Sequence, residues 1–180
     1  IPVRHGTTSG ELARLLAAER GLDLDLVVVP VRKWGRDTPY RDTGLPWIPP
    51  SPNIPTIETA RVYPGMCLLE GTSLSEGRGT TRPVHLVGAP WRDGPGRARR
   101  LRDLRLAGLG VRPARFRPMF GKHQGEVCGG VELFVLARAA LRPLAAGLRL
   151  LATVRDLHPA RFGWRPAPYE LVAAVPALDL

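Results

Sequence analysis

The chain has 180 residues, enough for one domain of ordinary size or for one domain and part of another. It carries a formal net charge of +10 and 44% hydrophobic residues, and no apolar run reaches the roughly 18 residues of a membrane helix. Membrane-spanning, collagen-like and wholly disordered classes are therefore excluded. Apart from Lys33 and Lys122, every basic residue is an arginine. This bias favours an ordinary arginine-rich surface, and a phosphate-binding face is the alternative.

The first predicted element is a helix that begins after Thr8. Thr8 and Glu11 have the spacing of a capping box, three leucines share one face, and Gly21 ends the helix. Residues 22–31 alternate aspartate with leucine and then run into valines, which predicts a strand. Residues 34–55 hold six prolines and two tryptophans, which is more typical of an ordered, extended loop than of a linker.

The rest of the chain alternates helical and strand patterns. Helices are predicted over residues 56–63, 97–107 and 138–154. Strands are predicted over residues 66–69, 84–87, 112–119 (an edge or irregular strand, because it holds two prolines) and 131–136, and residues 169–175 fit a short helix or strand. This order predicts an α/β fold, or a mixed α+β fold, with a small mixed sheet and flanking helices.

The cysteines and histidines predict no metal site. Cys67 and Cys128 lie in apolar stretches and are expected to be buried thiols, although a disulfide between them stays open. The four histidines are not clustered, and no zinc-ligand spacing, P-loop or dinucleotide fingerprint is found. We therefore expect neither a metal nor an organic cofactor.

The densest polar segment runs from Glu70 to Arg82. It combines glycines, hydroxyls, two carboxylates and two guanidiniums after a short apolar run, where α/β folds place ligand-binding loops. Such groups suit a sugar hydroxyl, an acetamido group or a carboxylate. A plain surface turn is the alternative.

Two further clusters contain side chains that could bind a ligand or transfer a proton. Lys122, His123 and Gln124 stand between glycines and offer a cation, a proton shuttle and an amide. Arg4 and His5 precede the first helix, where free backbone amides favour anions. Each cluster by itself is also compatible with an ordinary loop.

Taken in order, these segments resemble motifs of the exo-β-N-acetylmuramidases of the NamZ type. The resemblance covers essentially the whole chain. The matching segments are residues 1–13, 43–53, 63–65, 70–72, 75–83, 88–91, 122–126 and 128–130. The chain departs from the pattern at Thr7, Ser73 and Gly121, where the family more often has Met, Asn and Ser.

The resemblance implies a two-domain glycosidase that removes terminal N-acetylmuramic acid from peptidoglycan fragments. Residues 1–24 are expected to be the tail of a Rossmann-like N-terminal domain, and residues 25–180 the C-terminal α/β domain, truncated at its end. The resemblance implies a catalytic glutamate in the family's Ser-Pro-Glu-His-Gly motif, and this motif is absent from the sequence. The segment alone is therefore expected to be inactive.

The resemblance also implies a set of site residues and partners. Glu70, Glu76 and His123 are the catalytic candidates. The expected substrate-binding residues are Arg4, His5, Glu70, Thr72, Ser75, Glu76, Arg78, Thr80, Lys122, His123 and Gln124. The expected partners are a muramyl glycan from peptidoglycan and the Rossmann-like domain, with no nucleic acid and no membrane span. The expected location is extracellular or in the cell envelope.

Two other functions compete with this interpretation. The first is a non-catalytic module that binds muropeptides or other cell-wall material. The second is a nucleic-acid-binding protein, suggested by the charge of +10. The arginines between residues 97 and 105 are scattered around a predicted helix without interleaved aromatic residues, which disfavours the second.

Overall fold

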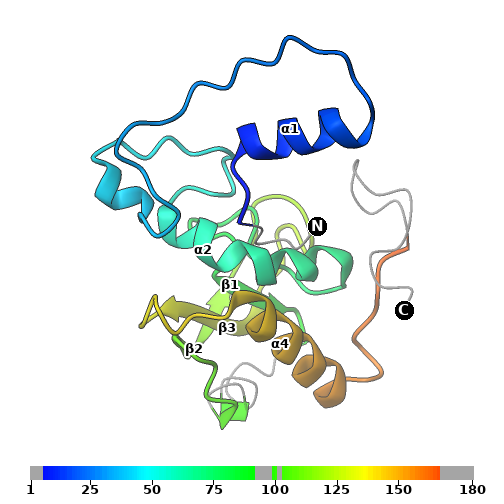
Figure 1. Ribbon diagram of the computed structural model, residues 1–180. Coiled ribbons are helices and arrows are strands. Elements are labelled where there is room, and N and C mark those ends of the chain that lie inside the picture. Colours follow the sequence, from blue (N-terminus) through cyan, green and yellow to red (C-terminus); the bar gives the residue numbers. More distant parts are fainter. Residues whose placement is uncertain (1–5, 92–98, 101–102, 167–180) are drawn as a thin grey trace. The chain divides into compact units, whose positions relative to one another are not determined.

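The computed structural model describes residues 6–91, 99–100 and 103–166. The chain forms two compact units, Ile1–Trp47 and Ile48–Leu180. Figure 1 shows the elements of each unit. The division concerns contacts within this chain, whereas the boundary expected after residue 24 concerns the domains of a two-domain enzyme, and that boundary stays a prediction.

The first unit contains the predicted N-terminal helix. Helix α1 spans Ser9–Glu19, and Thr8 is its N-cap. The Glu11 amide donates to Thr8 Oγ1 at 3.2 Å, and the Thr8 amide donates to Glu11 Oε2 at 2.8 Å. The capping box is therefore confirmed, and it satisfies two amides that the first helical turn leaves without intrahelical partners.

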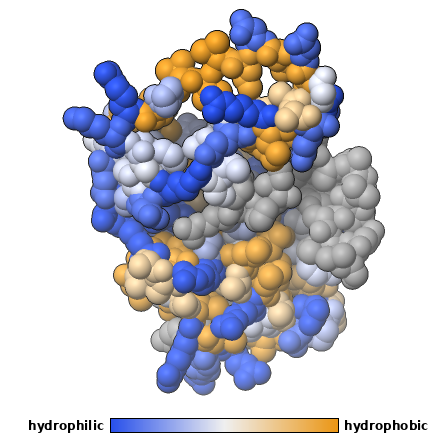
Figure 2. Space-filling model, in the orientation of Figure 1, coloured by the Kyte–Doolittle hydropathy of each residue, from blue (hydrophilic) through white to orange (hydrophobic). Residues whose placement is uncertain are grey.

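The strand predicted over residues 22–31 is wrong. The segment is extended, but no described strand pairs with it. Val27, Val29 and Val31 are 76%, 84% and 73% exposed, and Figure 2 shows apolar surface along this part of the unit. A strand needs a neighbour for its backbone N–H and C=O groups, and the alternating pattern alone does not supply one.

The proline-rich segment is an ordered loop, as expected. It contains the 3₁₀ turn η1, Tyr40–Thr43. The rings of Tyr40 and Trp47 meet edge to face with centroids 5.2 Å apart, and Tyr40 Oη donates to the carbonyl of Pro46 at 2.8 Å. The aromatic residues thus hold the loop by packing against each other.

The second unit is a small sheet with helices on one face, which confirms the predicted class in its mixed α+β form. The described sheet is antiparallel, so the expected mixed sheet is wrong. Its helical elements are α2 (Ile57–Met66), η2 (Cys67–Gly71) and α4 (Pro143–Leu157). Its strands are β1 (Leu86–Ala89), β2 (Leu109–Phe116) and β3 (Cys128–Val135), in the antiparallel order β1-β3-β2. Val87, Val131 and Leu133 face the helices and form the core with residues of α2 and α4.

Several predicted elements shift in the structure. The strand predicted over residues 66–69 is wrong, because these residues end α2 and form η2. Met66 and Leu69 are fully buried there, and a short apolar run fits a buried helical turn as well as a strand. The edge strand around Pro113 is confirmed as β2. The helix predicted over residues 138–154 begins only at Pro143, because proline suits the first helical turn.

Some predictions fall on parts that are not described. Of the helix predicted over residues 97–107, residues 99–100 and 103 are helical, whereas residues 104–107 form a turn, so this end of the prediction is wrong. The element expected over residues 169–175 lies outside the described residues.

Among the described helices, none has both the length and the apolar character needed to cross a bilayer. Cys67 and Cys128 do not form a disulfide, and Cys128 is buried whereas Cys67 is half-buried.

Helices α2 and α4 cross at two glycines. A Cβ added at Gly147 would lie 2.2 Å from the carbonyl oxygen of Gly65, and one added at Gly65 would lie 1.8 Å from that of Pro143. The two backbones therefore touch directly, and Figure 1 shows the helices side by side. Because α2 runs straight into η2, this contact sets the position of Glu70 at the end of the helical segment.

Candidate functional site

The loop that follows η2 is anchored at both of its ends. Its Ser75 forms a bridge to Gly88 of β1, with N–H···O distances of 2.8 and 3.0 Å. Gly77 and Gly79 have φ values of +78°, and added Cβ atoms there would lie within 3 Å of backbone atoms. Only glycine fits such positions without strain. The Gly-rich pattern therefore encodes one fixed loop conformation.

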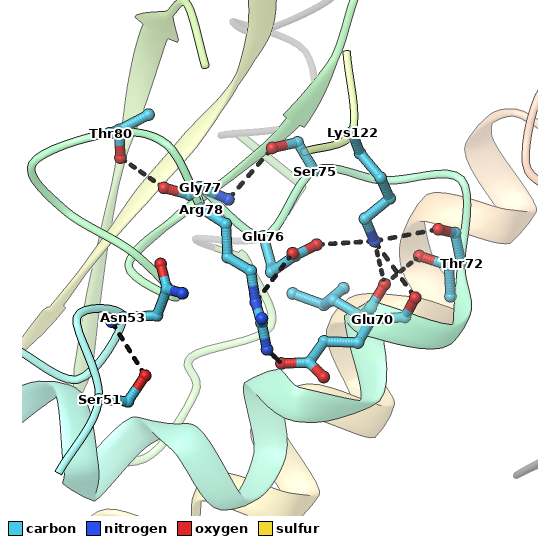
Figure 3. A network of polar contacts seen from close by, with 11 residues as sticks. Ser51, Asn53, Glu70, Thr72, Ser75, Glu76, Gly77, Arg78, Thr80 and Lys122 are labelled. Atoms are coloured by element: carbon cyan, nitrogen blue, oxygen red, sulfur yellow. Dashed lines mark hydrogen bonds and ion pairs between the residues drawn. The ribbon is translucent and has the colours of Figure 1, made fainter. Parts of the chain in front are cut away.

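Four charged side chains form one network at this loop. Arg78 pairs with both Glu70 and Glu76, and its Nε lies 3.4 Å from Glu76 Oε1. Lys122 Nζ lies 2.6 Å from Glu76 Oε2. Figure 3 shows this alternating chain of Glu70, Arg78, Glu76 and Lys122. Their side chains are 9%, 30%, 5% and 15% exposed, so Arg78 is the most accessible member.

Lys122 is held by backbone carbonyls as well as by the carboxylate of Glu76. Its ammonium group also donates to the carbonyls of Leu69 at 2.8 Å and Thr72 at 3.1 Å. Burial lowers the pKa of Lys122, and the carboxylate of Glu76 opposes this shift. With three protons and these acceptors, Lys122 fastens its own loop to the end of η2. The structure thus joins two clusters that lie some 50 residues apart in the sequence.

Three other residues that were predicted to bind substrate form hydrogen bonds within the loops of this region. Thr72 Oγ1 donates to Leu69 O at 2.8 Å, and Thr80 Oγ1 donates to Gly77 O at 2.6 Å. Ser75 Oγ accepts from the amide of Gly77 at 3.2 Å. These short side chains close turns next to the network, as hydroxyl groups commonly do.

His123 lies beside the network, whereas two other predicted residues do not join it. His123 Nε2 is 2.7 Å from the carbonyl oxygen of Ser73, so Nε2 carries the donated proton and Nδ1 faces Glu126 at 3.6 Å. Gln124 is exposed next to it. Arg4 and His5 lie outside the described residues.

A second charged cluster was missed by the sequence analysis. Glu132 of β3 accepts from Arg82 at 3.0 Å and from Arg112 at 2.7 and 3.1 Å. Hydrogen bonds from the two arginines outweigh the effect of burial and hold the pKa of Glu132 below its usual value. A single glutamate inside an otherwise apolar strand was the available signal.

His85 is also buried without having been predicted as a site residue. Its Nδ1 lies 3.0 Å from the carbonyl of Leu133, and no described residue bonds to its Nε2. Burial lowers the pKa of His85. His85 follows Val84, a buried residue with φ of +55°, and the amide of Val84 donates to the carbonyl of Glu76 at 2.6 Å. This strained turn connects the network to β1.

The geometry at the network suits a polar, uncharged ligand group. Two carboxylates and two cations balance, so the network itself has no net charge. Carboxylate oxygens accept from hydroxyl groups, and the partly exposed guanidinium of Arg78 donates. No group of three or more metal-binding side chains is found among the residues that the structure describes.

Comparisons with known proteins identify the family of this chain. The family model "Exo-beta-N-acetylmuramidase NamZ, C-terminal" matches residues 61–179, and its N-terminal counterpart matches residues 1–58. The peptidoglycan β-N-acetylmuramidase NamZ of Bacillus subtilis is 46% identical over 162 residues, which are 90% of this chain and 39% of that protein.

Two solved structures are also similar to this chain in fold and sequence. A DUF1343 family protein of Bacteroides fragilis superposes with a TM-score of 0.77 at 32% identity, over 84% of this chain and 40% of its own. A second DUF1343 protein of that organism gives 0.64 at 30% identity, over 92% and 43%. The chain thus spans about two-fifths of the length of these relatives. It belongs to the exo-β-N-acetylmuramidase NamZ family.

Proposed function

We propose that this chain supplies the glycan-binding, C-terminal part of an exo-acting β-N-acetylmuramidase. In this proposal the full-length protein releases terminal N-acetylmuramic acid from peptidoglycan fragments. The observation that carries the proposal is the network of Glu70, Arg78, Glu76 and Lys122, in a chain that belongs to the NamZ family. The proposed partner is a Rossmann-like N-terminal domain, and the proposed location is extracellular or in the cell envelope.

The network assigns different tasks to its members. Arg78 is the most accessible of the four, so it is the member that donates to a glycan oxygen. Glu70 and Glu76 hold its guanidinium from two sides and accept from hydroxyl groups. Lys122 is engaged by Glu76 and by backbone carbonyls, so it fixes the site and does not bind the glycan directly.

His123 is the catalytic candidate whose second ring nitrogen, Nδ1, faces an exposed carboxylate. Its Nε2 donates to Ser73, which leaves Nδ1 as the nitrogen that can accept a proton. Glu126 beside Nδ1 is 58% exposed, so a proton can pass to solvent. In the proposed enzyme, His123 moves a proton at Nδ1 while the neighbouring network holds the sugar.

The test compares Arg78→Ala with Arg155→Ala in the full-length protein. A charge-assisted hydrogen bond contributes about 1.5–3 kcal/mol, so Arg78→Ala should slow release of N-acetylmuramic acid from a chromogenic muramide by about tenfold or more. Arg155 is exposed and pairs only with its neighbour Asp156 among the described residues. Arg155→Ala therefore removes the same charge at a position outside the network and serves as the control. An unchanged kcat/KM for Arg78→Ala would refute the role.

A folding control accompanies this test. Arg78 neutralises two buried carboxylates, so its loss also lowers stability. Thermal unfolding identifies a temperature at which both variants are folded, and the rates are compared there. Arg78→Lys keeps the charge but loses the fork of donors, and it should recover only part of the rate.

A non-catalytic muropeptide-binding module is the second candidate. In this candidate function the same network of Glu70, Arg78, Glu76 and Lys122 holds a glycan without cleaving it. This alternative predicts binding of N-acetylmuramic acid without release of the chromogenic group. Hydrolysis by the full-length protein would eliminate it.

A further inference from the structure

The side of the sheet opposite the helices carries a cationic cluster. Residues of β3 alternate between the two faces, so Glu132 and Phe134 lie opposite the helices. Arg112 of β2 stands directly across from Glu132 in the register. Arg82, at the end of the loop that carries the network, reaches the same carboxylate. Two strands and one loop therefore converge on one glutamate.

The charge of this cluster differs from that of the Glu70–Lys122 network. One carboxylate meets two guanidiniums, which leaves an excess of one positive charge. Arg82 uses one nitrogen to contact Glu132 and Arg112 uses two. Because a guanidinium has five N–H donors, both arginines keep donors beyond these bonds. The side chains of Arg82 and Arg112 are 34% and 65% exposed, so a ligand can reach them.

The two guanidiniums are also oriented. Their central carbons lie 5.8 Å (Arg82) and 4.8 Å (Arg112) from the ring centroid of Phe134, within the range of cation–π contacts. Glu132 fixes them from one side and the ring from another. An arginine held in this way loses little rotamer freedom when it binds an anion, so the cluster is preorganised.

We propose that Arg82 and Arg112, held by Glu132 and Phe134, bind a carboxylate group of the muramyl ligand. This inference rests on the proposed function, because that function supplies a ligand with a carboxylate. A planar carboxylate matches the fork of guanidinium donors, and the unbalanced positive charge favours an anion here. The neutral network at Glu70 then receives hydroxyl groups, and the charged part of the ligand binds to the sheet.

The carboxylate has two sources in peptidoglycan fragments. In N-acetylmuramic acid it is the lactyl carboxylate, and in muramoyl peptides that group is an amide and the carboxylates are on the peptide. Three probes separate the sources: N-acetylmuramic acid, its lactyl methyl ester, and N-acetylmuramoyl dipeptide. The ester keeps the sugar and removes only the charge.

The experiment measures the Kd of each probe by calorimetry with the full-length protein. The test variant is Arg112→Gln, which leaves the pair of Arg82 and Glu132 in place. The control is Arg115→Gln, an exposed arginine on the same strand. Arg112→Gln should weaken binding of a carboxylate probe by about tenfold and leave the ester unchanged, and Arg115→Gln should change neither.

Each outcome decides the inference. Weaker binding of N-acetylmuramic acid identifies the lactyl carboxylate, and weaker binding of the dipeptide alone identifies the peptide. Equal affinities of Arg112→Gln and wild type for both acids overturn the proposal. The Nε–Hε signals of the wild-type arginines give a second readout, because an acid should shift those of Arg82 and Arg112 and the ester should not. Absence of hydrolysis by the wild-type protein would instead refute the proposed function and leave this binding difference standing.

Discussion

The crossing of α2 and α4 makes Gly147→Ala the most informative stability test. The new Cβ would lie 2.2 Å from the carbonyl oxygen of Gly65, and real Cβ contacts are essentially never below 3.0 Å. The helices must therefore separate by at least 3.0 − 2.2 = 0.8 Å, and no side-chain rotation can relieve the overlap because the partner atom is backbone.

The expected loss of stability follows from two opposing effects. Overlap with a rigid backbone lies at the upper end of the overpacking range, about 3 kcal/mol. Alanine is a better helix former than glycine by about 1 kcal/mol, which leaves a net loss of about 2 kcal/mol. Urea unfolding followed by circular dichroism measures it. Gly163→Ala is the control, since nothing lies within 4 Å of its added Cβ, and it should change stability by less than about 0.5 kcal/mol.

The Gly147→Ala substitution should also change the geometry of the candidate functional site. Helix α2 continues into η2, which ends next to Glu70, so moving α2 should displace one carboxylate of the network. A Gly147→Ala protein that is as stable as the wild type would refute the reasoning about direct backbone contact. It would mean that the two helices do not cross as closely as the glycines indicate.

Two further predictions concern buried titratable groups. Burial lowers the folded-state pKa of His85, so the full free energy of unfolding should be present above the unfolded pKa of about 6.5. It should fall as the pH drops below that value, by roughly 1 kcal/mol near pH 5.5. A His85→Gln variant that shows the same loss between pH 7.5 and 5.5 in urea unfolding would contradict this. Lys122→Met leaves the buried carboxylate of Glu76 without its ammonium partner and should cost about 3 kcal/mol in the same assay. Adding Glu76→Gln should recover part of that loss, and strictly additive losses would show that the two side chains are not coupled.

Local signals in the sequence were enough to predict elements that depend on near neighbours. The capping box at Thr8 and the edge strand around Pro113 follow from short-range chemistry, and both are confirmed. The segment 22–31 was mispredicted because pairing needs a second strand, which periodicity in one segment does not reveal. Residues 66–69 failed for a related reason, since burial on all sides removes the alternation that separates strand from helix.

The candidate site was predictable in part. The Gly-rich loop and Lys122 were singled out by residue type, yet their meeting at Glu76 is a tertiary contact across more than 40 residues that composition does not encode. The role of Lys122 as an anchor to backbone carbonyls is also visible only in three dimensions. Glu132 gave a weak signal, because the arginines that neutralise it come from a loop and from another strand.

The exposed valines of residues 22–31 have a consequence for the behaviour of the chain in solution. An extended apolar segment that no described strand pairs with is a template for pairing between copies. A net charge of +10 opposes that association by mutual repulsion, and salt at 0.1 M screens charges beyond about 10 Å. The arginine-rich composition therefore acts as a colloidal stabiliser, and ionic strength sets how well it keeps the copies apart.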